Sequence, residues 1–322
     1  MGRRMNMIEF QHVSKHFGHV QAVNDVSFSA SGGQVIGLLG VNGAGKSTIL
    51  NMMTGCMPPS SGCVRIDGMD MFRSGSACRR KLGYLPEQSP LYPEMTVQEY
   101  LTFVCRLREV QKTAIPGHVQ EIMHLCGLED VRNRLLGQLS RGYGQRAGIA
   151  QALCGTPEVL VLDEPTVGLD PRQVVEIRQL IHALGSTHTV IFSTHVLSEA
   201  QALCSRVLIV HHGRLVSDVS LTGETGRKAV HVFSACIAGN REQVLPAVRS
   251  LPSVIRVSEE PGSRDGQVLI SLETSDEDEG MNLRKALFRL LGAMDTPLLL
   301  LEKKRHLLED LFLKATKEDM EE

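Results

Sequence analysis

The sequence lacks an excess of charge of either sign. Its 34 lysine and arginine residues nearly balance its 36 aspartate and glutamate residues, which leaves a formal net charge of -2 at pH 7. Proteins that bind nucleic acid or a membrane surface through their overall field carry a clear excess of basic residues. The composition therefore supports neither class.

The sequence also lacks a long apolar run. None approaches the ~20 residues that span a bilayer. The amino-terminal segment MGRRMNMIEFQHVSKHF has a basic start but no apolar core of the kind that a signal peptide needs. We therefore expect any role at a membrane to come through a partner.

A cysteine motif for metal binding or redox chemistry is missing as well. The eight cysteines form no CxxC pair, and no histidine lies near them at metal-ligand spacing. This scatter favours buried, reduced thiols in a cytosolic protein. The cysteines are Cys56, Cys63, Cys78, Cys105, Cys126, Cys154, Cys204 and Cys236.

What is present predicts two domains. A chain of 322 residues with 42% apolar and 22% charged residues is ordinary for a soluble globular protein. Within residues 1–218, short β-rich runs alternate with helical patterns, which is typical of an α/β domain with a largely parallel core sheet. The predicted strands are MIEFQHV and VSFSA near the amino terminus, then QVIGLLG, VLVLDEP and TVIFSTH.

Two further regions differ from this pattern. Residues 96–136 have apolar residues at three- and four-residue spacing and predict amphipathic helices, which begin a helical subdomain over about residues 96–155. Residues 219–322 predict a separate small α+β domain. Its expected strands are AVHVFSACIA, SVIRVSEE, GQVLISLE and TPLLLLEKK, and its expected helices are REQVLPAVRSL, MNLRKALFRLLGAM and HLLEDLFLKATKED.

The strongest chemical signal is GVNGAGKST at residues 40–48, between a predicted strand and a predicted helix. Its glycines let the backbone curl and direct N–H groups at phosphate oxygens, and the next helix adds its positive end. We expect Lys46 to reach the β- and γ-phosphates and Ser47 to bind Mg²⁺. An accidental glycine turn is the alternative, disfavoured by this context. The predicted nucleotide-binding residues here are Gly40, Asn42, Gly43, Ala44, Gly45, Lys46, Ser47 and Thr48.

Two neighbouring carboxylates follow the strand in VLVLDEP. Asp163 is placed to hold the magnesium, and Glu164, which points to the other face, is placed to polarise a water for attack on the γ-phosphate. Such a pair can instead cap a following helix. Together with Lys46 and Ser47, the pair favours a site for ATP hydrolysis.

Two other residues are ambiguous from local sequence. His195 follows TVIFST and taken alone would be a structural histidine, but parallel strands present their carboxyl ends to one crevice, so it is placed to contact the γ-phosphate. Asp170 in GLDPRQVV is a good helix N-cap with Pro171 at the first helical position. A functional role for Asp170 needs more than this spacing.

The octapeptide LSRGYGQR at residues 139–146 has no metal ligand, obvious base or nucleophile. With GVNGAGKST, VLVLDEP, GLDP and STH in this order, it resembles the nucleotide-binding subunits of ATP-binding cassette (ABC) transporters across roughly residues 7–218. The tail LEDLFLKATKED resembles the ends of ABC-2-type exporter ATPases, including those of gliding-motility, drug and polysaccharide export systems.

The resemblance implies a P-loop cassette in which LSRGYGQR is the signature motif and two cassettes face each other head to tail. Each ATP would then lie between the phosphate loop of one subunit and Ser140 and Gly142 of the other. Without the other motifs, Ser140 would be a plain N-cap. The resemblance also implies that Phe17 in KHFG stacks on adenine, where the alternative is a core phenylalanine, that Asp170 lies in the loop that crosses the dimer interface, and that His195 is the switch histidine.

Four positions depart from the family pattern. Glu87 in GYLPEQ stands where the family usually has glutamine, with Gln88 beside it, and either side chain is placed to approach the magnesium and the attacking water. Val41 replaces a common proline, and we expect little change. Arg141 and Tyr143 replace the glycine and glutamine of LSGGQ, as in ABC-2-type relatives.

The expected function is therefore ATP hydrolysis, with ATP and Mg²⁺, by a subunit that drives an integral membrane permease, as an exporter, from the cytoplasmic face of the membrane. The expected partners are that permease and a second cassette, identical or closely related. The alternatives are a soluble ABC ATPase that acts on ribosomes or nucleic acid and a binding module that does not hydrolyse ATP. Glu164 argues against the second.

Overall fold

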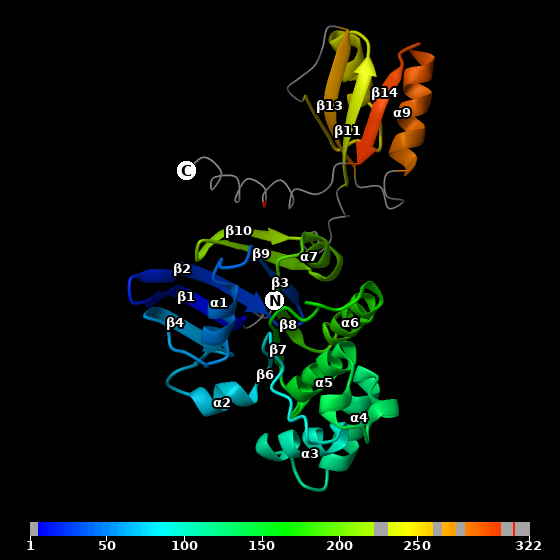
Figure 1. The fold of residues 1–322 in the computed structure, drawn as a ribbon. Coiled ribbons are helices and arrows are strands. Elements are labelled where there is room, and N and C mark those ends of the chain that lie inside the picture. The colour runs from blue at the N-terminus through cyan, green and yellow to red at the C-terminus, as the bar shows by residue number, and fades with distance from the viewer. Residues whose placement is uncertain (1–5, 222–230, 260–265, 275–280, 304–311, 313–322) are drawn as a thin grey trace, which may run out of the picture. The chain divides into compact units, whose positions relative to one another are not determined.

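The computed structural model describes residues 6–221, 231–259, 266–274, 281–303 and 312. They form two structural units, one within residues 6–221 and one made of the later described residues (Figure 1). The predicted domain boundary after residue 218 falls within β10 (Arg214–Ser220). Among the described residues, no helix combines the length and the apolar character needed to cross a bilayer.

A four-stranded antiparallel sheet opens the first unit, in the order β2-β1-β4-β5. The strands MIEFQHV and VSFSA predicted from alternating polarity lie within its first two members. Phe10 and Phe28 stack across β1 and β2 with ring centroids 4.7 Å apart, and both are buried. The strands are β1 (Asn6–Phe17), β2 (Val20–Ser31), β4 (Ser61–Ile66) and β5 (Met69–Asp70).

A six-stranded sheet forms the centre of this unit, in the order β10-β9-β3-β8-β7-β6. All neighbouring pairs are parallel except β10 with β9, so the predicted largely parallel core is confirmed. Parallel strands present their carboxyl ends at one edge of the sheet. Besides β10, the strands are β3 (Val35–Leu39), β6 (Leu82–Leu85), β7 (Val159–Leu162), β8 (Thr189–Thr194) and β9 (Arg206–His211).

Most helices of this unit lie below and to the right of the two sheets in the view of Figure 1. The predicted amphipathic helices of the insertion are present, and Thr96 with Glu99 forms a capping box at the first of them, which satisfies two N–H groups. Two short 3-10 turns, Glu129–Val131 and Leu136–Gln138, precede the third. The helices are α1 (Lys46–Met53), α2 (Gly75–Arg80), α3 (Val97–Leu107), α4 (Ile115–Cys126), α5 (Arg141–Leu153), α6 (Pro171–Leu184) and α7 (Leu197–Leu203).

The second unit has the order βαββαβ and its own apolar core, centred on Phe233, Ile270 and Leu287. Its sheet runs β12-β13-β11-β14, and every pair is antiparallel. The predicted α+β class is thus observed, while the closing helix predicted over residues 306–319 lies outside the described residues apart from position 312. The elements are β11 (His231–Ala238), α8 (Arg241–Arg249), β12 (Arg256–Glu259), β13 (Gln267–Thr274), α9 (Met281–Ala293) and β14 (Leu298–Lys303).

The cysteines are free thiols, as expected, but not all are buried. Cys56 is exposed, and Cys63 and Cys236 are half-buried. The prediction of buried thiols holds for the other five: Cys78, Cys105, Cys126, Cys154 and Cys204.

Candidate functional site

The predicted phosphate loop lies between the end of β3 and the start of α1, which begins at Lys46. Gly43 and Gly45 have φ angles of 81° and 104°, in the region that side chains with a Cβ rarely adopt. A Cβ on Gly45 would lie 2.6 Å from the carbonyl oxygen of Ala22. The loop therefore needs glycine here both for its turn and for its close packing.

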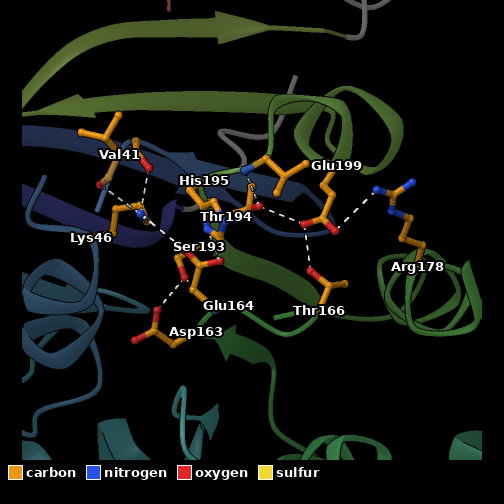
Figure 2. Close-up of polar contacts among 12 residues, drawn as sticks. Val41, Lys46, Asp163, Glu164, Thr166, Arg178, Ser193, Thr194, His195 and Glu199 are labelled. Atoms are coloured by element: carbon orange, nitrogen blue, oxygen red, sulfur yellow. Dashed lines mark hydrogen bonds and ion pairs between the residues drawn. The ribbon is translucent and has the colours of Figure 1, made fainter. Parts of the chain in front are cut away.

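The Lys46 side chain is buried within this loop. Its Nζ donates to the carbonyl oxygens of Gly40 at 2.8 Å and Val41 at 3.2 Å, and it lies 3.4 Å from Oε1 of Glu164 (Figure 2). A buried ammonium group needs such oxygen partners because burial removes its water. The loop carbonyls and Glu164 thus hold a positive charge where phosphates are expected.

The two predicted carboxylates follow the end of β7. The Ser193 hydroxyl on β8 donates to Oδ1 of Asp163 at 2.5 Å and accepts from the N–H of Glu164 at 2.8 Å. Glu164 has a φ of 47°, a left-handed conformation that is uncommon outside glycine and is found where structure constrains the chain. One buried hydroxyl therefore fixes both acidic residues.

His195 joins Glu164 from the neighbouring strand. Its Nδ1 lies 3.0 Å from Oε2 of Glu164, while the other carboxylate oxygen faces Lys46 (Figure 2). The His195 side chain is 40% exposed and that of Glu164 only 10%. The strand order thus brings the two residues together at the expected edge of the sheet, with the carboxylate inside and the imidazole toward solvent.

These residues border a pocket of about 360 Å³. Glu87 lines it as well, but neither the exposed Gln88 nor the buried Asp163 is among its lining residues. Ala22 and Val167 line it without having been singled out from the sequence. The lining is Ala22, Asn42, Gly43, Ala44, Gly45, Lys46, Ser47, Thr48, Glu87, Glu164, Val167 and His195.

Phe17 lies at the end of β1 and is 48% exposed. The alternative that it is a core residue is therefore wrong. The Nζ of Lys15 lies 5.3 Å from the centroid of its ring, within cation–π range. An exposed aromatic face is what stacking on adenine requires, and that role stays a prediction.

Tyr84, which sequence reasoning did not single out, supports the elements around the site without lining its pocket. Its hydroxyl donates to Oδ1 of Asn51 at 3.1 Å, and its carbonyl accepts from Nε2 of Gln151 at 2.5 Å. Burial, and then the nearby charge of Asp163, raise the pKa of the Tyr84 hydroxyl. Tyr84 remains neutral and links β6 to α1 and α5; the only sequence signal was its place in GYLPEQ, just before Glu87.

The predicted signature residues lie at the start of α5, where Ser140 is the N-cap and accepts from the N–H of Tyr143. The Tyr143 hydroxyl donates to Asp130 at 2.6 Å, and this bond raises its pKa. Gly142 is buried, and a Cβ there would lie 2.8 Å from Cδ of Gln173. Neither Ser140 nor Gly142 lines the pocket of its own chain.

Asp170 is the N-cap of α6 and accepts from the N–H of Gln173 at 2.9 Å. The capping alternatives for both Ser140 and Asp170 therefore describe real contacts. Their predicted contacts with a second cassette are additional to these bonds and stay predictions.

Comparison with known proteins agrees with this geometry. The sequence model described as ABC transporter matches residues 23–167. The chain is 34% identical to the uncharacterized ABC transporter ATP-binding protein YxlF of Bacillus subtilis over 72% of this chain and 77% of that protein. It is 34% identical to the bacitracin transport ATP-binding protein BcrA of Bacillus licheniformis, covering 66% and 69% of the two chains, and 31% identical to Nod factor export ATP-binding protein I of Rhizobium sp., covering 98% of both.

Among solved structures, the dimeric structure of MJ0796, described as a bacterial ABC transporter cassette, matches with a TM-score of 0.62 and 27% identity over 68% of this chain and all of that chain. A structure of the same cassette in a post-hydrolysis state with ADP and phosphate matches equally well. The fold and the site together define a P-loop ATPase of the cassette type. The chain belongs to the ABC transporter ATP-binding proteins: it binds ATP and hydrolyses it.

Proposed function

We propose that this chain hydrolyses ATP as one of two paired cassettes that power a separate membrane permease in export, with Glu164 as the general base. The observation that carries the proposal is the Glu164 carboxylate, whose two oxygens face Lys46 and His195 at the rim of the phosphate loop. A carboxylate held between two positively polarised groups is fixed in orientation, which general-base catalysis requires.

The residues take separate tasks in this proposal. The loop N–H groups and Lys46 bind the phosphates, with phosphate oxygens replacing the carbonyls of Gly40 and Val41 as acceptors for Nζ. Glu164 accepts a proton from the attacking water. His195 contacts the γ-phosphate and keeps the water in line, since its Nδ1 is already turned to Glu164.

The donor set fits Mg²⁺. Ser47 and Glu87 line the pocket, and Asp163, whose Oδ1 accepts from Ser193, directly precedes the pocket residue Glu164. Mg²⁺ prefers oxygen ligands and is bound by one or two protein groups together with substrate phosphates. Bound there, it would neutralise negative charge on the β- and γ-phosphates. Gln88 is proposed to act beside Glu87 only after its loop moves, because it does not line the pocket.

A second cassette would complete the nucleotide site. Ser140, Gly142 and Asp170 lie outside the pocket of their own chain, while their helix starts offer N–H groups to an anion. The similar structure of MJ0796 is described as dimeric, which supports a head-to-tail pair here. The second cassette is proposed to be the same chain or a closely related one.

Transport, and export in particular, is supported by the similar proteins. Two of them are named for bacitracin transport and Nod factor export, and a third for linearmycin resistance. These names favour a transport subunit over an ATPase that acts on ribosomes or nucleic acid. With a permease as its membrane partner, the chain would work at the cytoplasmic face of the membrane.

A second pocket offers a docking surface for that permease. It measures about 430 Å³ and lies where α2, β6 and α3 meet, next to the segment that carries Glu87. Leu107 at its edge is 66% exposed. We propose that this surface, next to the Glu87 segment, contacts the permease.

Replacement of Glu164 tests the proposal. We expect Glu164→Gln to lower kcat for Mg²⁺-ATP by about 10²- to 10⁴-fold, the usual contribution of a general base, while ATP still binds. The same variant should elute as a dimer with Mg²⁺-ATP in gel filtration. Glu158→Gln is the matched control, because this carboxylate pairs with Lys81 outside the pocket. An unchanged kcat, or a monomer at all ATP concentrations, would contradict the proposal.

A further inference from the structure

A second buried carboxylate lies close to the Glu164–His195 contact and has no part in the proposed reaction. Glu199, in the first turn of α7, is 3% exposed. Burial of a carboxylate is costly unless hydrogen bonds and charges compensate it. The hydrogen-bond and ion-pair partners of the Glu199 carboxylate therefore indicate its role.

Three side chains from three different elements surround this carboxylate (Figure 2). Its Oε2 accepts from the hydroxyls of Thr166 and Thr194, each at 2.9 Å, and its Oε1 lies 3.4 Å from a guanidinium nitrogen of Arg178. Thr166 follows β7, Thr194 ends β8, and Arg178 lies on α6. Glu199 thus ties two strand ends to a helix.

The two threonines are the close chain neighbours of the proposed catalytic pair. Thr194 directly precedes His195, and its hydroxyl also accepts from the N–H of Val196 at 3.0 Å, so it fixes the backbone on both sides of the histidine. Thr166 comes two residues after Glu164, in a turn closed by the bond from the N–H of Val167 to the Glu164 carbonyl at 3.1 Å. Both threonines are buried.

We propose that Glu199 is a positioning residue for ATP hydrolysis. By holding Thr166 and Thr194 on one carboxylate oxygen, it sets the separation of the two segments that carry Glu164 and His195. A general base must lie within hydrogen-bond distance of the proton that it removes. Small displacements of the base from this position lower the reaction rate strongly. The inference rests on the proposed function, in which Glu164 activates the water and His195 keeps it in line.

Removal of one hydroxyl at a time tests this role. Thr166→Val and Thr194→Val keep nearly the same volume but lose the bond to Glu199, and Thr194→Val also loses the bond from the N–H of Val196. We expect each to lower kcat by about 10-fold or more, toward the ~100-fold that a misplacement of about 1 Å costs. The KM for ATP should stay within about twofold, because the phosphate loop keeps its contacts. Thr166→Ser, which keeps the hydroxyl, should retain the original kcat.

Thr189→Val is the matched control. Thr189 lies at the opposite end of β8, is 2% exposed, and its hydroxyl accepts from the N–H of Gly33 at 3.1 Å. We expect it to lower the midpoint of thermal unfolding and leave kcat per folded molecule unchanged. A purely structural role for Glu199 predicts the same behaviour for Thr166→Val and Thr194→Val, and that result would overturn the proposal.

Two further variants separate this inference from the proposed function. If Glu164→Gln hydrolyses ATP at the normal rate, the proposed function fails whatever Glu199 does. If Glu164→Gln is inactive while both valine variants have normal kcat, only the positioning role fails. Adding Thr166→Val to Glu164→Gln should leave the residual rate unchanged, because no base remains to be positioned. If a valine variant does not fold, the corresponding alanine variant removes the same bond to Glu199 and is expected to lower kcat while the KM for ATP stays unchanged.

Discussion

At the scale of single residues, the site depends on groups that touch no nucleotide in the proposed arrangement. Ser193 is fully buried and bonded to both Asp163 and the Glu164 N–H. Neighbouring contacts of this kind act together, because loss of one leaves the others misplaced. The left-handed backbone at Glu164 is stable only because such contacts hold it.

Replacement of Ser193 should therefore cost stability as well as activity. Ser193→Ala leaves a buried carboxylate oxygen and a buried N–H without their partner, and we expect the free energy of unfolding to fall by about 1–3 kcal/mol. Urea denaturation measures the change. Ser186→Ala is the control, since the exposed Ser186 hydroxyl bonds only to the nearby carbonyl of Ala183. Equal stability of the two variants would show that the Ser193 bonds contribute little.

Glu87 gives a second prediction at this scale. Glu87 lines the pocket and stands at a sequence position where the ABC family usually has glutamine. Its negative charge therefore adds attraction for a cation. We expect Glu87→Gln to raise the Mg²⁺ concentration for half-maximal hydrolysis, with about 1.4 kcal/mol of lost attraction giving a tenfold shift. Glu94→Gln removes the same charge from an exposed position outside the pocket and should leave the Mg²⁺ titration unchanged. Superimposable curves for wild type and Glu87→Gln would exclude a metal role.

The sequence predicted most of the pocket residues because glycine spacing and strand-end carboxylates have direct chemical meaning. It did not predict Ser193, Thr166 or Glu199 as supporting groups. A serine, threonine or glutamate carries no local pattern for a bond to a strand that is distant in sequence, and only the order of β7 and β8 creates these bonds.

At the scale of elements, the starts of α5 and α6 are packed together. A Cβ on Gly142 would lie 2.8 Å from Gln173, and a Cβ on Gly168 would lie 2.2 Å from the Arg141 guanidinium carbon. Arg146 and Glu176 form an ion pair farther along the same helices. The segment with LSRGYGQR and the segment with GLDP are therefore packed directly against each other, which matters if both contact a second cassette.

A pair of substitutions separates packing from recognition at Gly142. Gly142→Ala introduces a methyl group against Gln173, and Gly142→Ala with Gln173→Ala restores the space. If Gly142 contacts the ATP of a partner cassette, the double variant should recover thermal stability but not the hydrolysis rate. Differential scanning calorimetry and steady-state hydrolysis measure the two effects. Recovery of both would assign Gly142 to packing alone.

The short elements show where sequence patterns end. β6 has only four residues, Leu82–Leu85, which is too few for a period to be read, and it was not predicted. The strand expected over SVIRVSEE is described as Arg256–Glu259, and just before it the N–H of Ile255 donates to the carbonyl of Glu273 in β13 at 2.7 Å. By contrast, the buried strands β3, β7 and β8 were predicted, since continuous apolar runs with glycine or acidic ends are distinctive.

At the scale of the whole molecule, the two described units have separate apolar cores. Ile36, Leu38 and Val161 belong to the core of the first unit, and Phe233 and Ile270 belong to that of the second. No residue belongs to both clusters among those that the structure describes. Units with separate cores unfold as separate cooperative transitions unless an interface couples them.

Ligand binding should then act on one transition only. ATP binds the folded first unit, so in Glu164→Gln, where it is not consumed, an ATP concentration of 100 times Kd should stabilise that unit by about 2.7 kcal/mol. In calorimetry we expect two transitions, of which Mg²⁺-ATP raises the Tm of one. A chain ending at Leu221 should keep the shifted transition and lose the other.

Lys46→Ala should abolish the shift of Tm, because its Nζ no longer contacts the phosphates. A single transition that moves as a whole would show instead that the two units unfold together, and a shift of the transition absent from the shorter chain would place nucleotide contacts in the second unit.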